Sequence, residues 1–159
     1  MIVRRRVERR RGGEIRVRLP FPEQELLREL AGELDELLRS GSEHDDVRRL
    51  FPPAYADSEQ DEAEYRDLVR EELLEGRREA LRAFETTIDR SRLSEDELDV
   101  WMRVLNDLRL VLGTRLDVTE DTFVEPIDRR DPDAQTLAVY AYLGWLQEQV
   151  VQATRVAGS

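Results

Sequence analysis

The alternation of apolar and charged residues near the start of the chain predicts a β-hairpin. Ile15, Val17 and Leu19 are each separated by one charged residue, which is the period of a strand with one buried face. A Gly-Gly pair just before this strand provides a turn, and two valines give the preceding segment a weaker apolar face. We therefore expect residues 1–20 to form a hairpin.

Apolar residues at helical spacing follow in two long stretches. A stripe of leucines predicts a helix over about 22–38. Residues 41–60 contain prolines and polar residues, so we expect a long connection there. The second stretch runs from about 58 to 88 and has Gly76 in its middle. Because glycine is unfavourable inside a helix, we expect a kink or a break at this position.

Two further helices have recognisable starting signals. Ser94 and Glu97 have the spacing of a capping box and precede an apolar arc that continues to Leu116. The last helix is expected to begin with Asp131 as N-cap and Pro132 at its first position. Its apolar residues point in nearly every direction, which is typical of a helix at the centre of a bundle or against another chain.

These patterns predict a mainly α protein with one domain over residues 1–159. Residues 1–20 would form the hairpin, and residues 21–159 a bundle of about four helices with the long loop at 41–60. A chain of this length can bury a sizeable core without a metal or a disulfide.

Composition narrows the cellular setting. The formal net charge of −11 favours solubility and repels polyanions at long range. The longest apolar run, residues 137–146, is too short to span a bilayer, and the N-terminus lacks the pattern of a secretory signal. We expect a cytoplasmic protein without a membrane partner. With no cysteine in the chain, neither disulfides nor thiolate metal sites can form.

Candidate catalytic residues are few. His44 is the only histidine and lies in a polar segment, so we interpret it as a solvated loop residue. The clusters of acidic residues precede helices, where negative charge offsets the helix dipole. The common phosphate-loop, nucleophile and metalloprotease motifs do not occur. We therefore expect no cofactor, no bound metal and no enzymatic activity, although an unrecognised enzyme stays open as an alternative.

The first twenty residues are strongly basic, with eight arginines against two glutamates. Six of these arginines form the candidate basic site: Arg4, Arg5, Arg6, Arg9, Arg10 and Arg11. They could contact the phosphates of a nucleic acid, as a β-ribbon can. They could equally pair with the acidic helices of this chain, of a second copy or of an acidic partner, and the acidity of the remaining chain favours this second interpretation.

The segment from Leu105 to Leu116 contains a second candidate patch. Arg109 falls inside the apolar arc of its helix, with Asn106 and Gly113 one turn to either side and Arg115 nearby. Because an unpaired buried charge is costly, this guanidinium needs partners. Either the patch recognises a carboxylate, or Arg109 makes an internal ion pair and Gly113 allows close helix packing. The second interpretation is the simpler one.

Two motifs resemble a known family. Leu-Asn-Asp-Leu-Arg-Leu-Val-Leu-Gly-Thr-Arg-Leu over 105–116 and Tyr-x-Tyr-Leu-Gly-Trp-Leu-Gln over 140–147 are similar to an actinobacterial AosR-like family, long carried as a domain of unknown function and often encoded beside the ClpS adaptor. The resemblance implies a stress regulator that partners a sigma factor and has no established catalytic residues. The family's redox response is attributed to an N-terminal cysteine pair, which this chain lacks, so a thiol switch does not carry over.

The sequence therefore predicts a non-enzymatic regulatory protein that acts through protein–protein interaction. We expect a homodimer, with the last helix and the edge of the hairpin as candidate association surfaces. Nucleic-acid binding through the basic hairpin is the alternative.

Overall fold

The N-terminal hairpin is part of a small sheet at one end of the helices. The computed structural model describes residues 5–40, 50, 60–116, 122 and 126–155, and for 60–66 the backbone only. Strands β1 (Val7–Arg9) and β2 (Ile15–Val17) pair antiparallel, with Val7 opposite Val17. A short strand that the sequence pattern did not reveal, β3 (Arg92–Leu93), pairs with the other edge of β2.

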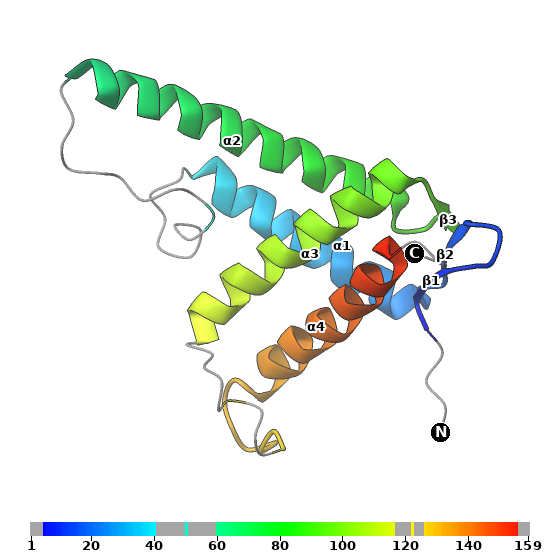
Figure 1. Ribbon diagram of the computed structural model, residues 1–159. Helices are drawn as coiled ribbons and strands as arrows, with labels where there is room; N and C mark the ends of the chain where they lie inside the picture. Colours follow the sequence, from blue (N-terminus) through cyan, green and yellow to red (C-terminus); the bar gives the residue numbers. More distant parts are fainter. Residues whose placement is uncertain (1–4, 41–49, 51–59, 117–121, 123–125, 156–159) are drawn as a thin grey trace.

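Four helices form the bulk of the described structure, so the predicted mainly α class and the N-terminal hairpin are confirmed (Figure 1). The helices are α1 (Phe21–Arg39), α2 (Gln60–Thr87), α3 (Glu95–Leu116) and α4 (Ala134–Thr154). Helix α3 lies between α2 and α4 and packs against both, and α4 also packs on β1. The N-terminal part of α2 extends beyond the other helices, where the Leu68 side chain is 59% exposed.

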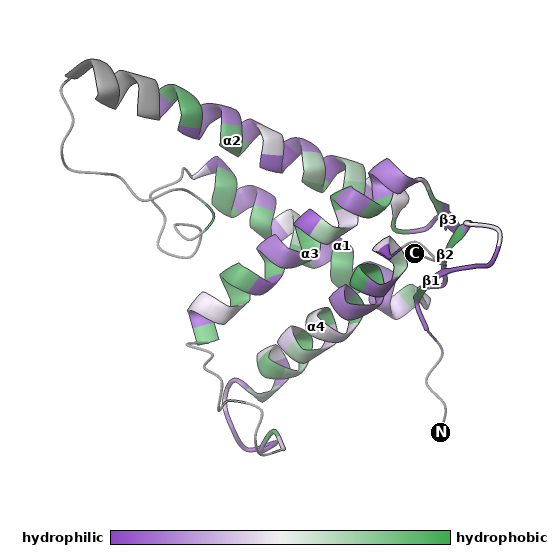
Figure 2. Cartoon of the chain, in the orientation of Figure 1, coloured by the Kyte–Doolittle hydropathy of each residue, from purple (hydrophilic) through white to green (hydrophobic). Residues whose placement is uncertain are grey.

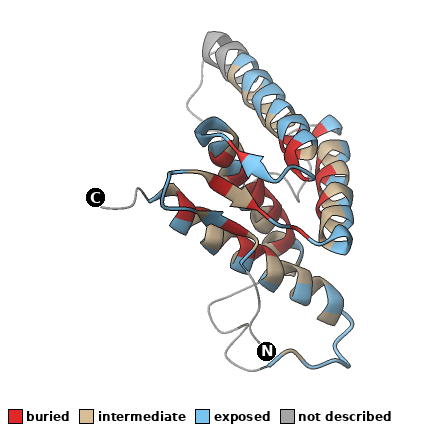
Figure 3. Cartoon of the chain, turned by 90° about the vertical axis from the view of Figure 1, so that its right-hand side faces the viewer, coloured by how far each residue is buried: buried red, intermediate tan, exposed pale blue. Residues whose placement is uncertain are grey.

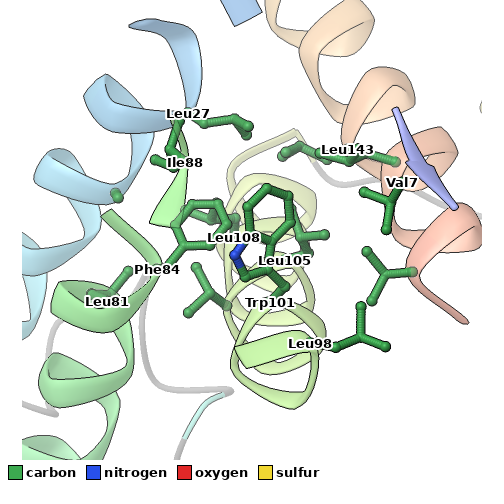
Figure 4. Close-up of a cluster of buried hydrophobic side chains, with 14 of the residues drawn as sticks. Val7, Leu27, Leu81, Phe84, Ile88, Leu98, Trp101, Leu105, Leu108 and Leu143 are labelled. Carbon is green, nitrogen blue, oxygen red and sulfur yellow. The ribbon is translucent and has the colours of Figure 1, made fainter. Parts of the chain in front are cut away.

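The core lies where α1, α2, α3 and α4 face one another beneath the sheet (Figures 3 and 4). Trp101 and Phe84 are both fully buried, and their rings meet edge to face with centroids 5.0 Å apart. The Trp101 indole nitrogen donates a 2.7 Å hydrogen bond to Thr87 Oγ1, which satisfies the one polar atom of this side chain. Hydrophilic residues dominate α2, whereas α4 is largely apolar (Figure 2).

The starting signals of the helices were predicted with mixed success. The capping box of α3 is confirmed, because Glu97 N–H donates to Ser94 Oγ and Ser94 N–H donates to Glu97 Oε1. The expected start of α4 at Asp131 and Pro132 is wrong. The Asp131 carboxylate accepts a bond from Asp133 N–H in a turn that precedes the helix, and α4 begins only at Ala134.

The expected kink or break at Gly76 is also wrong, because α2 is one continuous helix through this residue (Figure 1). Leu73 and Leu74 before Gly76, and Leu81 after it, pack on the same core. Burial of these side chains outweighs the cost of one glycine, which is about 1 kcal/mol.

We expect Gly76→Ala to raise the free energy of unfolding by about 1 kcal/mol, because alanine is the better helix former. The substitution meets no obstacle, since a Cβ built at this position has no neighbour within 4 Å. Urea unfolding followed by circular dichroism measures the change. Gly13→Ala is the control of opposite sign, because Gly13 has a φ of 87° that disfavours alanine. A lower free energy of unfolding in Gly76→Ala would contradict the conclusion that α2 is a continuous helix through this residue.

Some sequence-based predictions concern residues that the structure does not describe. The connection at 41–60, except Leu50 and Gln60, lies outside the described residues, as do His44 and Arg4. Among the helices that the structure describes, none is both long and apolar enough to cross a membrane.

Candidate interaction site

Arg109 lies half-buried between α3 and α4, whereas the sequence pattern had placed it only in the apolar arc of its own helix. Its Nη1 donates a 2.6 Å hydrogen bond to Gln147 Oε1, and its Nη2 lies 3.5 Å from the Tyr140 hydroxyl. The guanidinium carbon lies 5.1 Å from the centroid of the Tyr140 ring, within cation–π range. The Arg109 Nε is buried and has no hydrogen-bond partner. A cation is thus held by an aromatic ring and a carboxamide.

The partners of Arg109 differ from the internal ion pair that we expected. Both of its hydrogen-bond partners among the described residues are neutral. The distances do not show that close packing requires Gly113, because a Cβ there would lie 3.4 Å from the Tyr140 ring, which is an ordinary van der Waals distance. The same holds for Gly144 on α4, where a Cβ would lie 3.5 Å from Arg109 Nη2.

The four residues of the predicted patch do not form one cluster. Asn106 is exposed on α3, one turn before Arg109, and so lies on the same side of the helix. Arg115 instead faces α1, where it lines a hollow of about 420 Å³ together with Glu36 and Ser40. The candidate interaction site is therefore reduced to Asn106, Arg109, Gly113 and their α4 partners.

Asp107 is a structural anchor that the sequence reasoning missed. Its carboxylate accepts a 2.6 Å hydrogen bond from Arg77 Nη1 of α2, and Arg77 Nη2 also donates to the carbonyl of Leu50. Burial raises the pKa of Asp107, and the charge and hydrogen bond of Arg77 act in the opposite direction. Its position on the buried face, between Val104 and Val111 at helical spacing, was a signal that could have identified it.

The basic hairpin is held by acidic residues of the same chain. Arg6 forks onto Glu23 of α1, through Nε at 3.0 Å and 3.1 Å and through Nη2 at 2.9 Å. Tyr142 of α4 donates a 2.7 Å hydrogen bond to the same carboxylate. Trp145 lies beside this group, with the Arg6 guanidinium carbon 5.4 Å from its ring. Strand β1, α1 and α4 thus meet at one ion pair.

A second arginine of the hairpin is engaged in the same way. Arg9 pairs with Glu95 of α3 at 2.6 Å and donates through Nε to the carbonyl of Ala153. The Gln149 carboxamide oxygen accepts hydrogen bonds from the backbone N–H groups of Arg6 and Val7, so α4 covers part of the β1 edge.

The remaining described arginines of the basic site, Arg5, Arg10 and Arg11, are exposed. They are the described members that could meet an external partner.

Tyr142 gives the Glu23 cluster a measurable pH dependence. Burial, together with the hydrogen bond to Glu23, raises the pKa of the Tyr142 phenol above its ordinary value of 10.0. Above that pH the unfolded chain loses the phenolic proton while the folded chain keeps it. The contribution of this group to stability is therefore fully present below pH 10 and is lost as the pH rises further, by at most about 1.4 kcal/mol per pH unit.

We expect the stability of the wild type to fall more steeply than that of Tyr142→Phe at alkaline pH. Urea unfolding at several pH values from about 9 to about 11.5 measures both slopes, and the range stays below arginine ionisation. Tyr140→Phe is the matched control, because it removes a phenol of the same helix whose ring contacts Arg109. Parallel slopes for the wild type and Tyr142→Phe would contradict the assignment.

Several polar side chains of the two sequence motifs make contacts between elements: Asp107, Arg109, Tyr140, Tyr142 and Gln147. In the part of the chain that the structure describes, no group of three or more His, Cys, Asp or Glu residues could hold a metal ion. The arrangement can hold helices together and can present Arg109 and Asn106 at the α3–α4 face.

Comparison with known proteins identifies the family. The model of the domain of unknown function DUF2017 matches residues 4–154. Proteins named oxidative stress regulator AosR from Mycobacterium tuberculosis and Mycobacterium bovis are 30% identical to this chain over 191 residues, which cover 94% of this chain and 87% of each relative. No solved structure matches. The resemblance seen in the sequence is thereby confirmed, and the chain belongs to the DUF2017 family.

Proposed function

We propose that this chain is a non-enzymatic regulatory protein of the oxidative stress response that acts by binding another protein. One observation carries the proposal: similarity to relatives named oxidative stress regulator extends over 94% of the chain. Because the similarity extends far beyond one short motif, the regulatory role of the relatives is the best guide to the role of this protein.

The site geometry supports binding rather than catalysis. Glu23, Tyr142 and Asp107 carry groups that could serve in acid–base chemistry, but each is hydrogen-bonded to a neighbouring element. These hydrogen bonds connect the N-terminal strand region and the four helices to one another. Asn106 and the exposed arginines of the hairpin remain at the surface, where a partner can reach them.

The partner that we propose is a sigma factor, in keeping with the AosR-like family. The trigger must differ from a cysteine switch, because the chain contains no cysteine. The partner or the amount of the protein would then carry the stress signal. A homodimer is also proposed, through the apolar helix α4, whose Trp145 side chain is 37% exposed.

Nucleic-acid binding is the competing proposal. Arg5, Arg10 and Arg11 are exposed and favour it, whereas Arg6 and Arg9 are already paired with carboxylates. The strongly negative remainder of the chain also opposes contact with a polyanion.

The deciding experiment is capture of the tagged full chain from its own cells before and after peroxide treatment, with bound proteins quantified by mass spectrometry. We expect one sigma factor to be enriched, and the enrichment to survive nuclease treatment. A variant with Arg5, Arg10 and Arg11 changed to Ser serves as the control for nucleic acid. Enrichment that disappears both with nuclease and in this variant would replace the protein-binding proposal by nucleic-acid binding.

A further inference from the structure

Arg109 differs from most of the partly buried arginines. Six of these pair with a carboxylate, among them Arg6 with Glu23, Arg9 with Glu95, Arg77 with Asp107 and Arg78 with Asp35. In the described structure, Arg109 has only the neutral partners Gln147 and Tyr140. The contrast is informative in a chain with 36 acidic residues, where an internal counter-ion was readily available.

The unpaired cation has donors left over. A guanidinium carries five N–H donors, and two of those of Arg109 are directed at Gln147 and Tyr140. A partly buried charge without a counter-ion has lost part of its hydration, and a carboxylate can replace it with charge-assisted hydrogen bonds. The α3–α4 face therefore favours an external anion at this point.

One carboxamide contacts the guanidinium, and a second is exposed one turn away on α3. Gln147 uses its oxygen for Arg109, so its Nε2 remains as a donor. Asn106 is exposed three residues before Arg109 on the same side of α3. One cation flanked by neutral amide donors suits the single charge of a carboxylate. The net charge of −11 opposes the approach of nucleic-acid phosphates.

We propose that Arg109, Gln147 and Asn106 form a receptor for one Asp or Glu side chain of the partner protein. This inference rests on the proposed function and deepens it by naming the chemistry of the contact. The partner inserts a carboxylate that completes the ion pair missing between α3 and α4.

Nuclear magnetic resonance of the labelled full chain tests the receptor directly. The probes are the capped tripeptide Ala-Glu-Ala, its uncharged counterpart Ala-Gln-Ala and inorganic phosphate, all at matched ionic strength. We expect Ala-Glu-Ala to shift the Arg109 Nε–H and Gln147 side-chain signals saturably, and Ala-Gln-Ala to leave them in place. Equal shifts with both peptides, shifts with phosphate alone, or no shift would each overturn the proposal.

Gln147→Glu separates binding from a purely structural role. It supplies an internal carboxylate at hydrogen-bonding distance from Arg109, so the chain should fold with unchanged or greater stability and bind Ala-Glu-Ala at least tenfold more weakly. Gln135→Glu makes the same charge change at an exposed position of α4 and should leave the affinity within twofold. Equal peptide affinity in Gln147→Glu and the wild type would overturn the placement of the receptor.

The two proposals can fail separately. Suppose that a sigma factor is captured equally by the wild type and Gln147→Glu, and that Ala-Glu-Ala shifts no resonance signal. This result would contradict the carboxylate receptor and leave the regulatory proposal intact. If Ala-Glu-Ala shifts the Arg109 and Gln147 signals but no protein is captured from cells, the regulatory proposal is contradicted and the carboxylate site is retained.

Discussion

Replacement of Trp101 by alanine is expected to lower the free energy of unfolding by about 4 kcal/mol, the range found when a large buried aromatic is truncated. Trp101 is fully buried, stacks edge to face with Phe84 and donates its indole hydrogen bond to Thr87. The substitution leaves a cavity and also removes the partner of a buried hydroxyl. Urea unfolding followed by circular dichroism measures the loss.

Two controls divide this loss into its parts. Thr87→Val keeps the side-chain volume but removes the hydroxyl that accepts from Trp101 and donates to the Phe84 carbonyl, and it should cost about 2 kcal/mol because the indole N–H is left unsatisfied. Trp145→Ala removes the other tryptophan, which is 37% exposed, and should cost much less than Trp101→Ala. If the two tryptophan variants lost similar amounts of unfolding free energy, the result would contradict the assignment of Trp101 to the core.

Loss of the Asp107 carboxylate is the second large effect. Asp107→Ala should lower the free energy of unfolding by about 2 kcal/mol, because the half-buried Arg77 charge loses its ion pair with Asp107. The value lies below that of a fully buried pair, since the Arg77 side chain is 26% exposed. Thermal and urea unfolding at neutral pH measure the change.

The double variant Asp107→Leu with Arg77→Met tests the cause. Replacing both partners with apolar side chains removes the half-buried charge but also the Arg77 hydrogen bond to the Leu50 carbonyl, so part of the lost stability should return. Asp99→Ala is the matched control, because Asp99 is exposed on the same helix. A double variant as unstable as Asp107→Ala would show that the ion pair is not the source of the effect.

Residues with regular spacing were predictable from the sequence. The hairpin and the helices were recognised from the spacing of apolar residues, which is visible within each short segment of the sequence. The capping box at Ser94 and Glu97 is equally local, and the structure confirms it. Gly76 shows the limit, because its helix is decided by packing of leucines on both sides rather than by its own propensity.

The contacts of the site were much less predictable. Tyr142 and Glu23 are separated by 119 positions, and Arg6 and Gln149 by 143, so no local pattern links them. The position of Arg109 in the apolar arc was correctly predicted, but its neutral partners were not. Those partners depend on how α3 and α4 approach one another, which the periodicity of either helix leaves undetermined.

The Tyr140–Gln147 motif acquires a physical meaning from these contacts. Tyr140, Gly144 and Gln147 surround Arg109, whereas Tyr142 and Trp145 lie at the ion pair of Arg6 and Glu23. One helix thus holds two arginines on two of its sides. Arg6 is paired with a carboxylate of this chain, whereas for Arg109 we propose that the partner protein supplies the carboxylate.

Photo-crosslinking in the protein's own cells tests most directly whether a partner protein binds at this face. The probe is p-benzoylphenylalanine in place of Ala141, which is exposed on α4 one turn before Gly144 and is not part of the proposed receptor. We expect a protein adduct on irradiation that contains a sigma factor and becomes much weaker when Gln147→Glu is added. No adduct above the unirradiated control, with or without peroxide, would contradict the account.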